Sequence, residues 1–132
     1  MEQYLQDITS INDVKLLVNT FYDNVRTDDL IGPIFNGKIE DRWPEHLEKM
    51  YRFWQTVLLD EHTYFGSPFP PHANLPIQEE HFDVWLSIFN FTVDKLFKGE
   101  KADEAKWRAG KMANMFITKI NYYRTSSGSP LV

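Results

Sequence analysis

The four histidines, His46, His62, His72 and His81, are the residues of this sequence best suited to bind a metal. The chain has no cysteine, so disulfides, thiolate zinc sites and iron–sulfur clusters are excluded, and a metal would need nitrogen or oxygen ligands. No His-Glu-x-x-His pair is present, and no glutamate stands three residues before a histidine. Helical zinc sites and di-iron bundles use those spacings, so the sequence disfavours both and leaves a mixed histidine–carboxylate metal protein as a weak third interpretation.

A single histidine can still hold an iron porphyrin. Haem needs one imidazole on one face, a slot lined by apolar and aromatic groups, and a polar or open opposite face. His72 stands in Pro-Pro-His-Ala-Asn-Leu-Pro-Ile, where prolines restrict the backbone and apolar neighbours could exclude water. Most isolated histidines are surface residues or satisfied core groups, so the residues alone leave both roles open for His72.

Three further side chains could place polar atoms in such a slot. His46 precedes Met50 by one helical turn, at the edge of an apolar stripe, although the same spacing suits a solvent-facing histidine. Tyr22 could direct its hydroxyl into a pocket or keep it in water. Trp85 could present its indole N–H or serve only as core.

Composition indicates one globular domain of 132 residues with a single core. Its aromatic share of 15% suits a fold wrapped around a flat group. The net charge is −5 and the basic residues form no block, so a nucleic-acid partner is not expected. The opening residues are polar and no apolar run approaches a membrane span, which predicts no membrane association and a cytoplasmic location.

Apolar residues at helical spacing predict an all-α fold, and no period-two strand pattern competes with it. A corner with an apolar tip is expected at Leu30 to Gly37, because Gly32 and Pro33 interrupt helical bonding.

We expect one domain over residues 1–124 and a flexible tail over 125–132. The predicted helices run from Ile11 to Arg26 with a Ser10–Asp13 capping box, from Pro44 to about Asp60, from Glu79 to Phe97, and from Asp103 to Arg124; a proline-rich limb from Glu61 to Ile77 contains His72.

Taken in order, several short motifs resemble those of a group III truncated haemoglobin. The resemblance extends from Ile11 to Arg124, and the paired glycines of the other truncated groups are missing. The motifs are Phe21-Tyr22, Gly32-Pro33-Ile34-Phe35, Trp43-x-x-His46, Phe53-Trp54, His72-x-x-Leu75-Pro76 and Phe82-x-x-Trp85-Leu86.

The resemblance implies a truncated globin fold, a two-over-two helical sandwich around haem b. It assigns the iron ligand to His72 and the distal residues that stabilise a bound ligand to Tyr22, His46 and Trp85. The expected haem-pocket residues are Phe21, Phe35, Lys49, Met50, Arg52, Phe53, Leu75 and Ile77, of which Lys49 and Arg52 are candidates for the haem propionates or are simply solvated helix charges.

The implied function is binding of oxygen, nitric oxide or carbon monoxide at the iron. O–H and N–H donors in a dry pocket stabilise charge on bound oxygen, which favours slow release over bulk oxygen transport. Reaction of oxygen with nitric oxide and the use of peroxide, with an unidentified reductase as partner, are open alternatives. A haem-free helical interaction module, with the aromatic residues in its core or in a partner groove, is the competing interpretation.

Overall fold

The computed structural model describes residues 5–64 and 78–125, and in the last three of these only the backbone. All regular structure in these ranges is α-helical, which confirms the predicted all-α class. The helices are α1 (Ile11–Thr27), α2 (Gly32–Ile39), α3 (Trp43–Leu59), α5 (Glu79–Leu96) and α6 (Glu100–Thr125). None of these helices is both long enough and apolar enough to span a bilayer.

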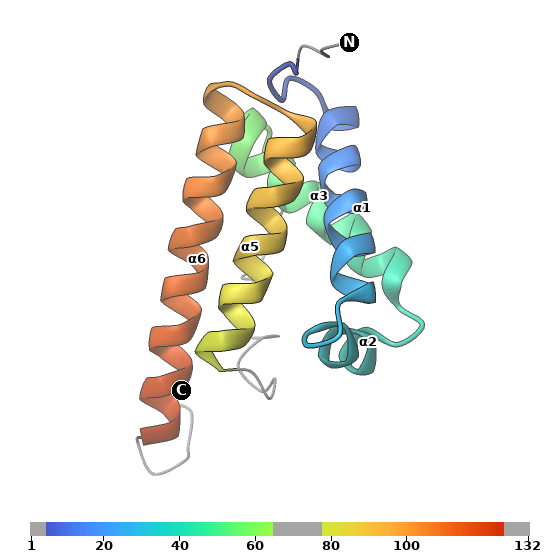
Figure 1. The fold of residues 1–132 in the computed structure, drawn as a ribbon. Helices are drawn as coiled ribbons and strands as arrows, with labels where there is room; N and C mark the ends of the chain where they lie inside the picture. The colour runs from blue at the N-terminus through green and yellow to red at the C-terminus, as the bar shows by residue number, and fades with distance from the viewer. Residues whose placement is uncertain (1–4, 65–77, 126–132) are drawn as a thin grey trace.

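Two helix pairs form the two layers of the fold. Helix α1 packs against α3, and α5 packs against α6 (Figure 1). Contacts of α1 with α5 join the pairs, and the short α2 packs against α1. This arrangement is the predicted two-over-two sandwich.

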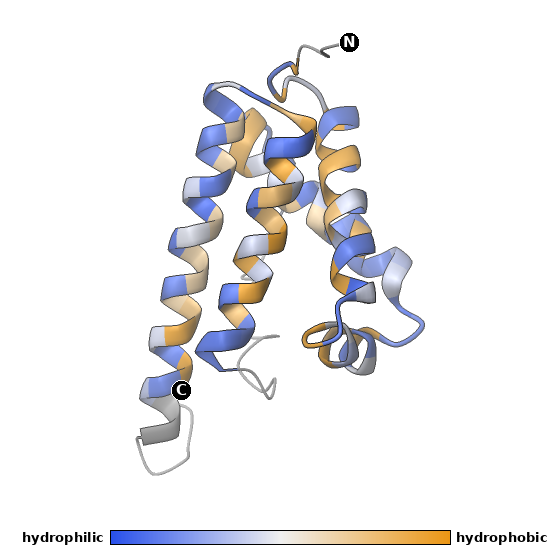
Figure 2. Cartoon of the chain, in the orientation of Figure 1, coloured by the Kyte–Doolittle hydropathy of each residue, from blue (hydrophilic) through white to orange (hydrophobic). Residues whose placement is uncertain are grey.

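Helix α1 forms where the sequence predicted it, because its start signal and its apolar stripe agree. The Ser10 hydroxyl accepts a hydrogen bond from the Asp13 backbone N–H, and the Asp13 carboxylate accepts one from the Ser10 N–H, which completes the capping box. Val14, Leu17 and Phe21 recur at helical spacing and are all buried. The apolar faces of the helices turn inward in this way throughout the two layers (Figure 2).

The predicted corner at Leu30 to Gly37 is wrong in one respect, because helix α2 occupies most of it. Pro33 lies in the first turn of α2. Backbone N–H groups in a first turn have no acceptor within the helix, so proline, which lacks an N–H, costs no hydrogen bond there. Gly32 is needed for a close approach, since a Cβ there would lie 2.8 Å from the Arg26 carbonyl oxygen. Phe35 and Ile39 lie one turn apart and are both buried.

The start of α6, predicted at Asp103, lies at Glu100 because a residue near the N-terminus caps it. The carboxylate of Asp7 accepts hydrogen bonds from the backbone N–H groups of Lys101 and Ala102, each at 2.9 Å. Burial of Asp7 opposes ionisation, but backbone hydrogen bonds from Lys101, Ile8 and Ala102 outweigh it and lower its pKa. Gly99 has φ +144°, and a Cβ there would lie 2.5 Å from Asp7 Cγ, so this junction requires glycine.

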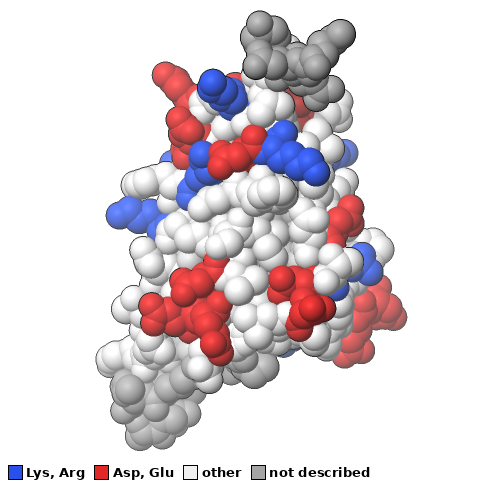
Figure 3. All heavy atoms as spheres, viewed as in Figure 1, with Lys and Arg blue, Asp and Glu red and all other residues white. Residues whose placement is uncertain are grey.

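Charged side chains lie on the outside of the fold. In Figure 3 they gather in groups toward the two ends of the visible face, separated by a band of uncharged residues. Lys106 pairs with Asp94 across α5 and α6 at 2.6 Å, and Arg108 pairs with Glu104 at 3.0 Å. Such exposed pairs contribute little to stability, so the fold depends on the apolar core between the layers.

Candidate functional site

A pocket lies between the two helix layers. The space between its lining side chains is about 650 Å³, part of which is open solvent. Every described helix contributes to its lining. The lining residues are Phe21 and Tyr22 of α1, Phe35 of α2, Met50, Phe53 and Trp54 of α3, His81, Phe82 and Trp85 of α5, and Met112, Ala113 and Phe116 of α6.

An aromatic cluster fixes the inner wall of the pocket. The ring of Phe21 meets Tyr22, Trp85 and Phe89 edge-on, with centroids 4.8, 5.5 and 5.2 Å away. Phe89 stacks against both Trp85 and Trp54, at 5.9 and 5.1 Å. Edge-on and stacked contacts at these distances are favourable, so the wall is a rigid, largely apolar surface.

Tyr22 brings a polar atom into this apolar setting. Its side chain is only 6% exposed, and no other described residue forms a hydrogen bond with its hydroxyl. Burial raises the pKa of the Tyr22 phenol well above its usual value, because the phenolate would lose its hydration. The phenol therefore stays protonated over the physiological range and is available as an O–H donor.

Trp85 supplies a second candidate donor on the facing layer. It is half-buried, lines the same pocket as Tyr22, and is held between Phe21 and Phe89. Its indole N–H can only donate a hydrogen bond. The pocket thus brings together one O–H and one N–H donor from α1 and α5.

His46 lies next to Tyr22 and does not line the pocket directly. Its ring meets Tyr22 edge-on with centroids 4.9 Å apart and meets Trp43 at 5.6 Å, and its Nε2 atom is buried. The imidazole therefore packs against the Tyr22 ring. Direct contact of His46 with a ligand stays a prediction, and it would require the side chain to swing inward.

The two basic residues expected at the pocket are not among its lining residues. The guanidinium of Arg52 binds Glu48 at 2.7 Å and donates to Gln55 Oε1 at 3.1 Å, with 41% of its side chain exposed. Lys49 is exposed on the same helix. Their assignment to the haem propionates therefore stays untested.

Six of the expected site residues are brought together in the pocket. These are Phe21, Tyr22, Phe35, Met50, Phe53 and Trp85. His72, Leu75 and Ile77 lie outside the described residues. Six lining residues were not predicted for the site: Trp54, His81, Phe82, Met112, Ala113 and Phe116.

Most of the missed lining residues carried a usable sequence signal. Trp54, Phe82, Met112 and Phe116 recur with other apolar residues at helical spacing, which predicts that they face inward, but this spacing does not say which of them line a cavity. His81 precedes Trp85 by four residues, so the two share one helix face.

The side-chain types of the described lining fit haem, which is a flat and largely apolar group. A flat apolar ring suits walls built from aromatic and methionine side chains. The Tyr22 hydroxyl has no hydrogen-bond partner among the described residues, so it is available to donate to a ligand in the pocket. The pocket therefore suits a flat prosthetic group that carries a small polar ligand.

Comparison with known proteins agrees with this geometry. A family model described as bacterial-like globin matches residues 6–119. The chain is 34% identical over 111 residues to group 3 truncated hemoglobin ctb of Campylobacter jejuni, across 81% of this chain and 87% of that protein. It is also similar to the crystal structure of group III truncated hemoglobin from Campylobacter jejuni, with a TM-score of 0.82 and 31% identity over 91% of this chain and 98% of the other. The chain therefore belongs to the bacterial-like globin family and is a group III truncated haemoglobin.

Proposed function

We propose that this globin binds haem b with His72 as the iron ligand and uses Tyr22 and Trp85 to hold oxygen, nitric oxide or carbon monoxide. The observation that carries the proposal is the protonated Tyr22 phenol, which is buried at an apolar pocket and has no hydrogen-bond partner among the described residues. Membership of a haem-binding family counts against the haem-free interaction module.

The environments of the described histidines support His72 as the ligand. His62 is exposed and does not line the pocket. His81 accepts a hydrogen bond at Nδ1, which leaves its proton on Nε2, where a metal ligand would need a bare nitrogen. His46 lies beside Tyr22 and Trp43, where it can orient the distal donor. When bound, haem would supply the iron at which a diatomic ligand attaches.

Tyr22 and Trp85 would act by donating hydrogen bonds to the ligand. A neutral donor contributes about 0.5 to 1.5 kcal/mol, which slows ligand loss about 2- to 13-fold, and two donors multiply the effect if they act independently. A pocket that retains its ligand in this way suits chemistry on the ligand better than bulk oxygen transport. Reaction with nitric oxide or peroxide, supported by an unidentified reductase, is the activity that we propose on this ground.

Oxygen release tests the donor assignment. We would load the purified protein with haem, mix it with excess carbon monoxide in a stopped-flow instrument and record the oxygen dissociation rate. Tyr22→Phe and Trp85→Phe should each raise that rate. Tyr51→Phe is the matched control, because the Tyr51 hydroxyl binds Asn19 outside the pocket. Unchanged rates in both pocket variants would refute the distal-donor account.

A second assay tests the choice of chemistry. Nitric oxide is added to the oxygen-loaded ferrous protein and nitrate formation is measured; in parallel, peroxide reduction by the ferric protein is followed with an added organic electron donor that supplies the two electrons per peroxide. Nitrate in a one-to-one yield, or sustained peroxide turnover, supports ligand chemistry. A failure of both reactions, together with fast oxygen release, would support oxygen transport instead.

A further inference from the structure

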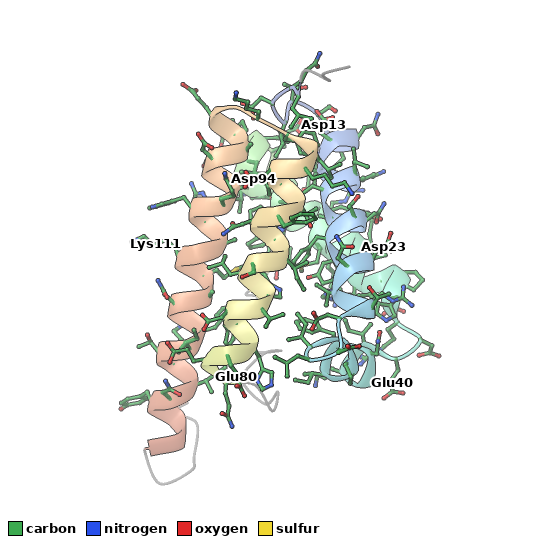
Figure 4. The ribbon with its side chains drawn as sticks, viewed as in Figure 1. Asp13, Asp23, Glu40, Glu80, Asp94 and Lys111 are labelled. Carbon is green, nitrogen blue, oxygen red and sulfur yellow. The ribbon has the colours of Figure 1, made fainter. Side chains whose placement is uncertain are left out.

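His81 occupies a position in the pocket that the distal site does not explain. It lies in the first turn of α5, one turn before Trp85, and lines the same pocket. Its neighbours Glu79 and Glu80 are exposed, and Figure 4 labels Glu80 at the end of α5 nearest α2. Phe35 of α2 lines the pocket as well, so this part of the lining lies toward the α2 end of the helix layers.

The backbone fixes the protonation pattern of the His81 ring. The N–H of Gln78 donates a hydrogen bond to His81 Nδ1 at 2.8 Å, so Nδ1 carries a lone pair. The neutral imidazole must then carry its proton on Nε2. His81 is half-buried and lines the pocket, and the N–H that its ring can still donate is the one on Nε2.

The rest of the lining shows which part of a ligand this donor can meet. Apart from the two distal donors, Tyr22 and Trp85, the other lining side chains are aromatic rings, methionines and an alanine. A flat apolar cofactor with carboxylates on one edge must keep those charges near solvent, because burying them without partners is costly. Arg52, an expected partner for these carboxylates, is already bound to Glu48 and Gln55.

We propose that the Nε2–H of His81 donates a hydrogen bond to a carboxylate of the bound cofactor and so fixes the cofactor's orientation in the pocket. The proposal rests on the proposed function, since it requires haem to be bound. A bond between an N–H and a carboxylate is charge-assisted, and the Gln78 contact holds the donor in one orientation before the cofactor enters. His81 is thus a positioning residue for the cofactor and not a ligand of its iron.

The test compares cofactor loss for two cofactors, haem and its dimethyl ester, in which both carboxylates are uncharged. Each loaded protein is mixed with an excess of a haem-scavenging apoprotein, and transfer is followed by visible absorption. His81→Phe should lose haem about threefold to tenfold faster than the wild type, as expected for one half-exposed charge-assisted bond. His81→Gln should stay near the wild-type rate, because glutamine can accept the Gln78 N–H and still donate.

The dimethyl ester separates the proposed contact from a loosened helix end. With the ester, the difference in release rate between His81→Phe and the wild type should be clearly smaller, because an ester carbonyl accepts only a neutral, weaker hydrogen bond. His62→Phe is the control for replacing a histidine outside the pocket, and its rates should match the wild type.

The failing outcomes are distinct. Haem loss from His81→Phe at the wild-type rate, or an equal acceleration with both cofactors, would overturn the His81 proposal and leave the proposed function intact. Failure of the wild-type protein to take up haem would overturn both.

Discussion

Replacing Tyr22 by phenylalanine should have opposite effects on the empty fold and on the ligand-bound protein. In the haem-free chain the Tyr22 side chain is largely buried, its hydroxyl has no hydrogen-bond partner among the described residues, and burial raises the pKa of the phenol. A hydroxyl that is fully shielded from water and left without a partner costs about 1 to 3 kcal/mol. Phenylalanine keeps the ring contacts with Phe21, Trp43 and His46 and removes only the hydroxyl.

Loss of the Tyr22 hydroxyl should change both the free energy of unfolding and the oxygen dissociation rate. The free energy of unfolding of the haem-free Tyr22→Phe protein should rise by about 1 kcal/mol. This is the lower end of that range, because water in the pocket can form a hydrogen bond with the wild-type hydroxyl and so reduce the cost of burying it. In the loaded protein the lost donor should speed oxygen dissociation about 2- to 13-fold. The substitution would thus stabilise the fold and weaken its hold on the ligand, as is common at functional sites.

Both effects can be measured on one preparation. Urea unfolding of the haem-free protein, followed by circular dichroism, gives the stability change, and stopped-flow displacement of oxygen gives the rate. Tyr51→Phe is the control and should show the reverse pattern: unchanged oxygen release and a slightly less stable fold, because a hydrogen bond to Asn19 is lost. A Tyr22→Phe protein that is less stable and releases oxygen at the wild-type rate would refute the reasoning.

Four further substitutions test other parts of the structure. Trp85→Phe should speed oxygen dissociation about 2- to 13-fold, measured as for Tyr22, and an unchanged rate would remove Trp85 from the distal site. Asp7→Ala should lower the urea-derived stability at neutral pH by about 1 kcal/mol, because the start of α6 loses its cap. The folded pKa of Asp7 is below its ordinary value of 3.8, so its contribution is present above that pH and is lost as pH falls through the folded pKa; the variant and wild-type acid-unfolding curves should therefore converge at low pH. Gly99→Ala should destabilise the fold by about 1 to 3 kcal/mol through its positive φ and the clash with Asp7, and an unchanged thermal midpoint would contradict this. Leu58→Ala removes a fully buried side chain and should cost about 2 to 5 kcal/mol in the same urea assay.

Most of the fold could be predicted from the sequence because local signals and apolar spacing agree. The start of α1 at Ile11 follows from its capping box, and α3 begins at Trp43, next to the predicted Pro44. Helix α2 was missed because Gly32-Pro33 was interpreted only as a helix breaker, although proline is well placed in a first turn. The start of α6 could not be found locally, because Asp7, which caps it, lies 94 residues before Lys101.

The site was predicted less completely, because a cavity depends on how helices pack. The α1 and α3 parts of the lining were largely expected, through Phe21, Tyr22, Met50 and Phe53. The α6 part was not expected, since the tilt of α6 against α5 is a tertiary property. The role of His81 also depends on a backbone contact that sequence spacing does not reveal.

The visible absorption spectrum of the purified protein, supplied with haem, tests the central claim most directly. It should be recorded oxidised, reduced and with carbon monoxide, for the wild type and for His72→Ala. We expect one haem per chain in the wild type, with bands that shift on reduction and again with carbon monoxide, and weak or absent haem binding in His72→Ala. A wild-type chain that takes up no haem, or a His72→Ala protein with wild-type spectra and stoichiometry, would contradict the account.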